Sequence, residues 1–397
     1  MTAGARPGGS VSDAPDPAVA VQRSRTITLL VLTAVGGSLA IALGAPIATA
    51  VIGLILFGIL HNLLEIRYVA GRFSGLLGRP FLELLVALIT GIVVCRLLAG
   101  VIGRPALLAE IVLGYAILAA AARHGLDGRR RVVAWVVIGA AAAVSLSFPT
   151  YHFVVLTHLH NVVPLFFLWE WSRRITSRRG RQAFRAVQLL WVLVIPTVVV
   201  LGFLDGSLSA DPGIVRSVVG DGQTVLAASA PPSTAATVLG MRFLTVFAFM
   251  QTMHYVVWVA LLPRVAPDAS AAFEARVPWV TGPRLWATGF VGAALFAVLF
   301  GLDFVQGKAL YAALASYHAY LELPVLLALL VGARSLSGPS RSAGRRDAAE
   351  SETAPTMPTP TPPTPPTPLP PARGGSRGAE LRPEATAAVA PDTEVTS

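Results

Sequence analysis

Long apolar runs separated by short polar segments fill this chain from about residue 25 to residue 332. Most runs are close to the twenty residues that an α-helix needs to cross the hydrocarbon core of a bilayer. The pattern therefore predicts an all-α fold, a polytopic integral membrane helical bundle with about ten transmembrane helices. The predicted spans are 27–44, 46–66, 81–100, 106–123, 131–148, 151–171, 185–205, 236–262, 285–301 and 307–332.

The two ends of the chain have a different composition from the predicted transmembrane domain, 25–332. Residues 1–24 are rich in Gly, Ala, Ser, Pro and Asp without apolar periodicity, which predicts a disordered N-terminal lead. Residues 333–397 contain the segment TPTPPTPPTPLPPA, which favours an extended polyproline II conformation. We interpret this segment as a disordered, solvated tail, with docking to a Pro-binding partner domain as the alternative.

Charge supports a membrane protein and argues against a nucleic-acid partner. Only 13% of the residues are charged and 54% are hydrophobic. The net charge of +10 comes from arginines that fall in short clusters between apolar runs, not in one patch. These clusters occupy alternate loops, so the positive-inside tendency predicts a multi-pass protein of the cell membrane with both termini cytoplasmic. Membrane lipids are then its expected partners.

Histidines stand out within the apolar runs. An ionisable side chain in a transmembrane helix costs several kcal/mol unless it is paired or faces the bundle interior, so it is a candidate functional residue. Of seven histidines, His124 lies in an Arg-rich turn and His152 near a span end. The other five are predicted metal ligands: His61, His158, His160, His254 and His318.

Two of these histidines share a spacing with a glutamate. In HNLLE, Glu65 follows His61 by four residues, and in HAYLE, Glu322 follows His318 in the same way. Side chains at i and i+4 lie on one helix face, so each glutamate is a candidate ligand or a candidate hydrogen-bond partner that orients its histidine.

The remaining candidates are placed by helix geometry. In THLHN, His158 and His160 are two residues apart, about 200° around a regular helix, so only one of them can face a common centre. We favour His160, with Asn161 as a neighbouring polar group, and Gln251 takes the same role one turn before His254. The histidines lie in the second, sixth, eighth and tenth spans, which all run in one direction, at depths that permit a shared layer.

The available donors limit the metal. A single cysteine, Cys95, excludes a site of several thiolates, so any metal must use imidazole, carboxylate or amide ligands. Such a set suits iron, copper or zinc. The chain has no Walker A motif, no GxGxxG before a helix, no CxxCH and no HExxH.

The element HNLLE, together with histidines distributed over separate helices, resembles the Brp/Blh group of membrane carotene-cleaving oxygenases. The element corresponds to the early His-Gly-x-x-Asp motif of that group, with Asn62 for Gly and Glu65 for Asp. The resemblance implies a non-haem iron oxygenase that uses dioxygen on a lipophilic substrate.

Two alternatives belong to other classes of function. Pairs of the same histidines are suited to ligating haem in an electron-transfer protein. A proton-coupled transporter would use the same His and Glu residues as a proton relay or a substrate site near the bilayer midplane.

Overall fold

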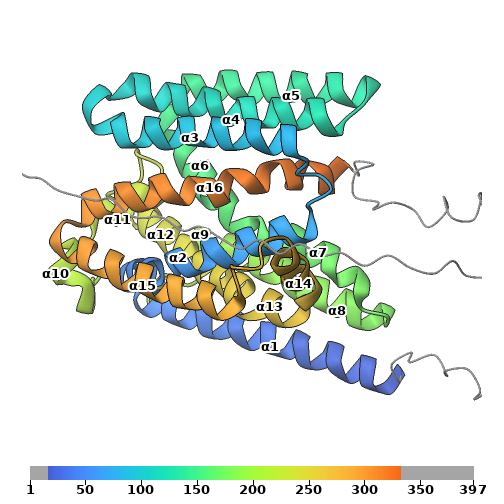
Figure 1. The fold of residues 1–397 in the computed structure, drawn as a ribbon. Helices are drawn as coiled ribbons and strands as arrows, with labels where there is room; N and C mark the ends of the chain where they lie inside the picture. Colours follow the sequence, from blue (N-terminus) through green and yellow to red (C-terminus); the bar gives the residue numbers. More distant parts are fainter. Residues whose placement is uncertain (1–16, 332–397) are drawn as a thin grey trace, which may run out of the picture. The chain divides into compact units, whose positions relative to one another are not determined.

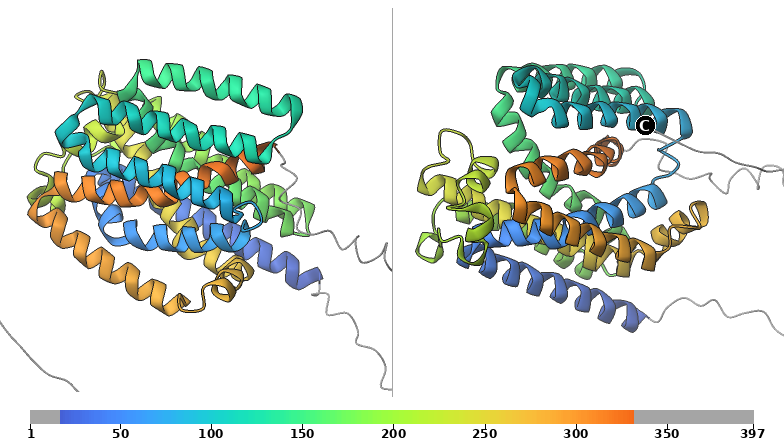
Figure 2. Two further views of the ribbon diagram at one scale, coloured as in Figure 1. Left: turned by 45° about the horizontal axis from the view of Figure 1, so that its top comes forward. Right: turned by 60° about the vertical axis from the view of Figure 1, so that its left-hand side comes forward.

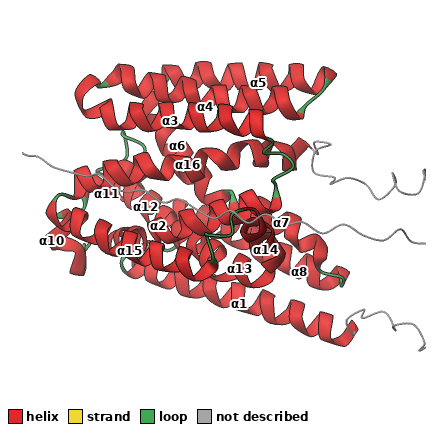
Figure 3. Cartoon of the chain, viewed as in Figure 1, coloured by secondary structure: helices red, strands yellow, loops and turns green. Residues whose placement is uncertain are grey.

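A computed structural model describes residues 17–331, and these residues form helices joined by short turns (Figures 1 and 3). Within them there is no strand, and ten helices are long and apolar enough to cross a membrane, which confirms the predicted fold class and number of spans. The predicted tail, 333–397, and residues 1–16 of the predicted lead lie outside the described residues. Helix α1 begins at Pro17, so the lead predicted to end at residue 24 overlaps this helix.

Seven of the ten spans are single helices. They are α1 (Pro17–Gly44), α2 (Pro46–Arg72), α3 (Arg79–Ile102), α4 (Arg104–Gly125), α5 (Gly128–Ser147), α15 (Gly282–Leu302) and α16 (Phe304–Val331). Several of them begin with a proline in the first turn, where its missing N–H leaves no hydrogen bond unmade.

Proline interrupts the other three spans. The sixth span consists of α6 (Pro149–Val162), α7 (Pro164–Trp171) and the 3₁₀ turn η1 (Ser172–Arg174). The seventh comprises α8 (Arg178–Leu189), the π-helical segment η2 (Leu190–Val194) and α9 (Ile195–Val200), and the eighth comprises α12 (Val238–Tyr255), the π-helical segment η5 (Val256–Leu261) and α13 (Leu262–Val265). Each π-helical segment ends two residues before a proline, Pro196 or Pro263. Proline cannot donate a helical hydrogen bond, and its ring crowds the carbonyl four residues earlier.

Short helices connect the spans at the two ends of the bundle. At one end lie η3 (Asp205–Ser207), η4 (Gly213–Val215), α10 (Arg216–Val219) and α11 (Gln223–Ser229), and at the other lies α14 (Pro267–Arg276). The start of α1 and the end of α16 lie at the α14 end (Figure 1). This end, which we call the arginine-rich end, carries the ion pairs Arg67–Glu274, Arg72–Glu170 and Arg174–Asp268.

Helix α2 is central to the bundle. It packs against α12, α14, α15 and α16, and α1 packs outside it against α12 and α8. Close packing of α2 is possible because glycines face it or lie on it: a Cβ at Gly289 or Gly292 of α15 would meet the side chains of Leu60 and Ile59. The interior around α2 is therefore where buried polar side chains can meet.

Helices α3, α4 and α5 form a separate layer, seen along one side of the bundle in both views of Figure 2. Helix α16 packs against α3 and α4, and α5 packs mainly against α4. None of the 20 residues of α5 is buried within the described structure. Helix α6 leads from this layer back to the core (Figure 1).

Candidate metal centre

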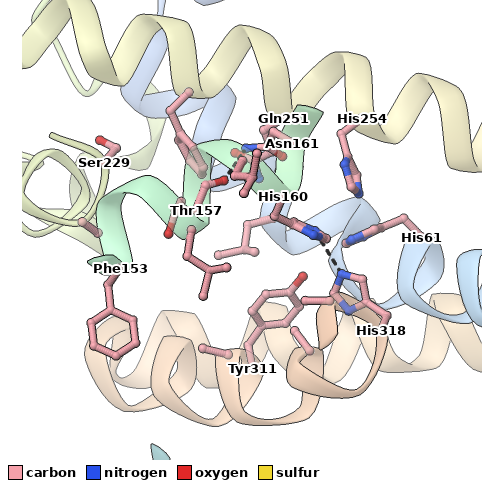
Figure 4. Close-up of a pocket in the computed structure, with 18 of the residues that line it drawn as sticks. His61, Phe153, Thr157, His160, Asn161, Ser229, Gln251, His254, Tyr311 and His318 are labelled. Carbon is pink, nitrogen blue, oxygen red and sulfur yellow. Dashed lines mark hydrogen bonds between the residues drawn. The ribbon is translucent and has the colours of Figure 1, made fainter. Parts of the chain in front are cut away.

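Four histidines meet in the interior of the bundle, one from each of α2, α6, α12 and α16 (Figure 4). One ring nitrogen of each lies within 4.8 Å of the others, and we call His61, His160, His254 and His318 the histidine cluster. His61, His254 and His318 are each at most 3% exposed. The structure thus brings together four of the five histidines proposed as ligands.

His158 is the histidine that lies outside. Its Nε2 atom is 2.8 Å from the backbone carbonyl of Ser229 in α11, on the other side of α6 from the cluster. His160 faces inward instead, and the angular separation within THLHN allows only one of the two histidines to do so. The carbonyl of His160 accepts the N–H of Val163 at 3.1 Å, and α6 ends at Val162, before Pro164 begins α7. The helix break at the proline follows directly after the inward-facing histidine.

In two cluster histidines, the Nδ1 atom lies within hydrogen-bond distance of an oxygen acceptor. His160 Nδ1 lies 3.0 Å from Glu322 Oε2, and His61 Nδ1 lies 2.9 Å from the carbonyl of Phe57. An acceptor at Nδ1 favours the tautomer that carries its proton there and leaves Nε2 unprotonated. Nε2 of His160 faces Nε2 of His318 at 3.2 Å, within hydrogen-bond distance, so the ring nitrogens of these two histidines point at one another.

Six polar atoms of the histidine cluster and of the adjacent Glu65 and Glu322 are buried without hydrogen-bond partners among the described residues. They are both ring nitrogens of His254, Nδ1 of His318, both carboxyl oxygens of Glu65 and Oε1 of Glu322. Glu65 Oε2 lies 3.7 Å from His254 Nε2, which is longer than a hydrogen bond. An unpaired buried polar group costs about 1–3 kcal/mol. Several such groups in one place therefore indicate that they share a common partner, such as a bound ion.

A single metal ion fits this donor set. Two nitrogens on opposite sides of an ion, each about 2.1 Å from it, are separated by about 4.2 Å. The observed spread of up to 4.8 Å therefore needs only small side-chain movements. The cluster residues could hold a metal ion, and the two glutamates are placed to orient the imidazoles or to complete the coordination.

A cavity of about 250 Å³ adjoins the cluster. All four cluster histidines line it, together with Asn161 and Gln251. Neither amide contacts an imidazole among the hydrogen bonds described: Asn161 donates to Thr157 O at 3.3 Å, and Gln251 donates to the hydroxyl of Tyr255 at 2.6 Å. In Figure 4, Ser229 and Phe153 mark the part of the cavity farthest from the imidazoles.

Aromatic and cationic groups that the sequence reasoning did not single out also line the cavity. Tyr255 packs on His61 with ring centroids 4.7 Å apart, and Tyr311 reaches the carbonyl of Gly58 at 3.4 Å. Arg96 of α3 and Lys308 of α16 are two cations that line the cavity. Their charge in otherwise apolar runs is the signal that could have found them.

Comparison with known proteins gives no family for this chain. No protein-family model, curated protein or solved structure matches it. Its function is therefore inferred from the geometry of the site.

Proposed function

We propose that this protein is a membrane metalloprotein whose histidine cluster binds one non-haem iron ion, and that it is an oxidoreductase acting on a lipophilic substrate. The observation that supports it most is the convergence of four imidazoles from four helices on one buried point beside an apolar cavity. Neutral imidazoles with nearby carboxylates and no thiolate suit Fe(II), with copper the next candidate.

The chemistry divides between the ion and the chain. The four histidines would hold the iron ion, which would supply the activation of dioxygen when bound. The chain supplies the remaining functions: Glu322 fixes the orientation of His160, Glu65 lies beside His254, and the apolar cavity wall excludes water and holds the substrate. The resemblance of HNLLE to the Brp/Blh element supports the same assignment.

The spacing of the rings favours a non-haem ion over haem. Ring centroids of neighbouring cluster histidines are 4.6–5.1 Å apart, as in His160–His254 and His61–His254. A porphyrin provides four ligands in its own plane and leaves two axial positions for protein side chains. Four imidazoles this close to one another leave no space for a macrocycle among them.

Topology is part of the proposal. Ten spans place the two ends of the described chain at the arginine-rich end, and the positive-inside tendency assigns this end to the cytoplasm. We place the protein in the cell membrane with this orientation.

Metal analysis with an absorption spectrum tests the proposal. Protein purified in detergent is expected to contain about one iron per chain with no Soret band, and to lose the iron in both His61→Ala and His254→Ala. His158→Ala is the matched control, because this histidine lies on the same helix as His160 but outside the cluster. Wild-type protein that contains neither iron nor copper after anaerobic reconstitution would overturn the proposal and favour a transporter; a Soret band would favour haem.

A further inference from the structure

The cavity extends away from the histidine cluster along α16. Lys308, Ala312, Ala315 and His318 of this helix all line it, at spacings of four, three and three residues that place them on one helix face. At a rise of about 1.5 Å per residue, Lys308 lies about 15 Å from His318, which is about the length of an extended chain of a dozen carbon atoms. Ala312 and Ala315, at the two intermediate positions, have small side chains that leave the cavity open between Lys308 and His318.

The far end of the cavity carries a cation without a counter-ion. Lys308 is partly buried, and no carboxylate of the described residues lies within ion-pair distance of it. Its closest described aromatic contact is Phe304, whose ring centroid lies 5.9 Å from the ammonium nitrogen. An ammonium group at the edge of an apolar cavity is favourable only if an anion or water accepts its hydrogen bonds.

Arg96, the second cation that lines the cavity, is different because its charge is compensated. It pairs with the buried Glu110 at 2.7 Å and donates to the carbonyl of Ala312 at 2.6 Å. Arg96 therefore has a structural explanation within the chain, whereas the ammonium group of Lys308 has none.

From this asymmetry we propose that the cavity binds a single-chain amphiphile with an anionic head. Lys308 holds the carboxylate or phosphate of the head, and the apolar chain passes over Ala312 and Ala315 to reach the histidine cluster. That this ligand is a substrate rests on the proposed function. It implies that oxidation falls about 15 Å from the head, and that an apolar hydrocarbon without a charged end is a poorer ligand.

Binding of dodecanoate tests the proposal without any measurement of activity. The full chain, in nanodiscs of zwitterionic phosphatidylcholine, is titrated with radiolabelled dodecanoate, with dodecyl phosphate and with the neutral dodecanol, and empty nanodiscs are subtracted. A charge-assisted hydrogen bond contributes about 1.5–3 kcal/mol, which corresponds to a tenfold or larger change in Kd. We expect Lys308→Met to weaken binding of both anions about tenfold and to leave dodecanol unchanged, and Lys308→Arg to retain most of the affinity.

Arg104→Met is the matched control, because Arg104 is an exposed cation at the start of α4 that does not line the cavity. The proposal is overturned if Lys308→Met binds dodecanoate like the wild type, or if Arg104→Met weakens it as much, which would indicate a general surface-charge effect. Iron content separates the two proposals. Unchanged dodecanoate binding in Lys308→Met with the iron present overturns only the ligand class, whereas a metal-free wild type overturns the proposed function whatever the Lys308 variants show.

Discussion

Helices α5 and α12 are both apolar enough to cross a membrane, yet they occupy opposite environments. None of the 20 residues of α5 is buried, whereas 11 of the 18 residues of α12 are. What differs in their sequences is polarity inside the span: α12 carries Gln251 and His254, and the apolar core of α5 carries no ionisable residue. In a bilayer, hydropathy selects spans, and the polar residues within them identify the core.

The largest expected effect is loss of iron from a core variant, which tests whether metal binding depends on the core and not on the outer layer. Loss of His254 removes one of four ligands and leaves the remaining groups buried, so iron content in His254→Ala is expected to fall below about one tenth of the wild-type value. His152→Ala, on α6 beside the outer layer, is expected to keep its iron because His152 bonds Ser145 of α5 at 3.0 Å. Metal analysis after size-exclusion chromatography measures both. Equal loss in the two variants would contradict the division between core and layer.

A smaller effect is expected from the carboxylates that surround the cluster. Glu322→Gln keeps the size of the side chain but replaces the carboxyl group that contacts His160 Nδ1 with an amide, so iron affinity should fall about tenfold. Glu83→Gln is the control, because Glu83 is exposed on α3 and pairs only with Arg79 among the described contacts. Competition with a chelator gives both affinities. An unchanged affinity in Glu322→Gln would mean that Glu322 does not support the site.

Sequence predicted the spans better than it predicted depth within them. In the predicted spans, His61 lies 5 residues before the cytoplasmic end at residue 66, and His318 lies 14 residues before the end at residue 332. The two histidines would then differ in depth by more than two helical turns. In the structure His61 and His254 each lie 11 residues before their last helical residues, Arg72 and Val265, and His318 lies 13 before Val331. Helix α2 continues through Arg67 and Arg72 because glutamates of α7 and α14 pair with them, and hydropathy alone ends the span too early.

The sequence could not locate the cavity or its cations. Arg96 lies within an apolar run, and its partner Glu110 is on the next helix, 14 residues away. No local pattern links two residues that meet only when α3 packs on α4. Likewise, His158 contacts the carbonyl of Ser229 in a connecting helix without a recognisable motif, whereas His160 contacts Glu322 and His318. Tertiary packing decides these contacts.

The packing around glycines differs between the core and the outer layer. A Cβ at Gly71 in α2 would overlap the backbone carbonyl of Ala269 in α14, whereas a Cβ at Gly139 in α5 would have no atom within 4 Å. Gly71→Ala is therefore expected to destabilise the protein by about 1–3 kcal/mol, since backbone cannot move aside as a side chain can. Gly139→Ala should stabilise it by up to about 1 kcal/mol through helix propensity. Thermal unfolding in detergent measures both, and shifts of the same sign would contradict the comparison.

The smallest effect concerns a surface pair at the arginine-rich end. The Arg174 guanidinium, bonded to Asp268 at 2.8–2.9 Å, lowers the pKa of that carboxyl below its usual value. A lowered pKa contributes stability above the unfolded value of about 3.9, and this contribution is lost as the pH falls through the folded value. Because the pair is about half exposed, Asp268→Asn should cost about 0.2–1 kcal/mol at pH 7. The difference in melting temperature from the wild type should then shrink as the pH falls through the lowered pKa of Asp268 in the folded protein, whereas a difference that does not change with pH would show that packing of α14, and not the ion pair, depends on Asp268.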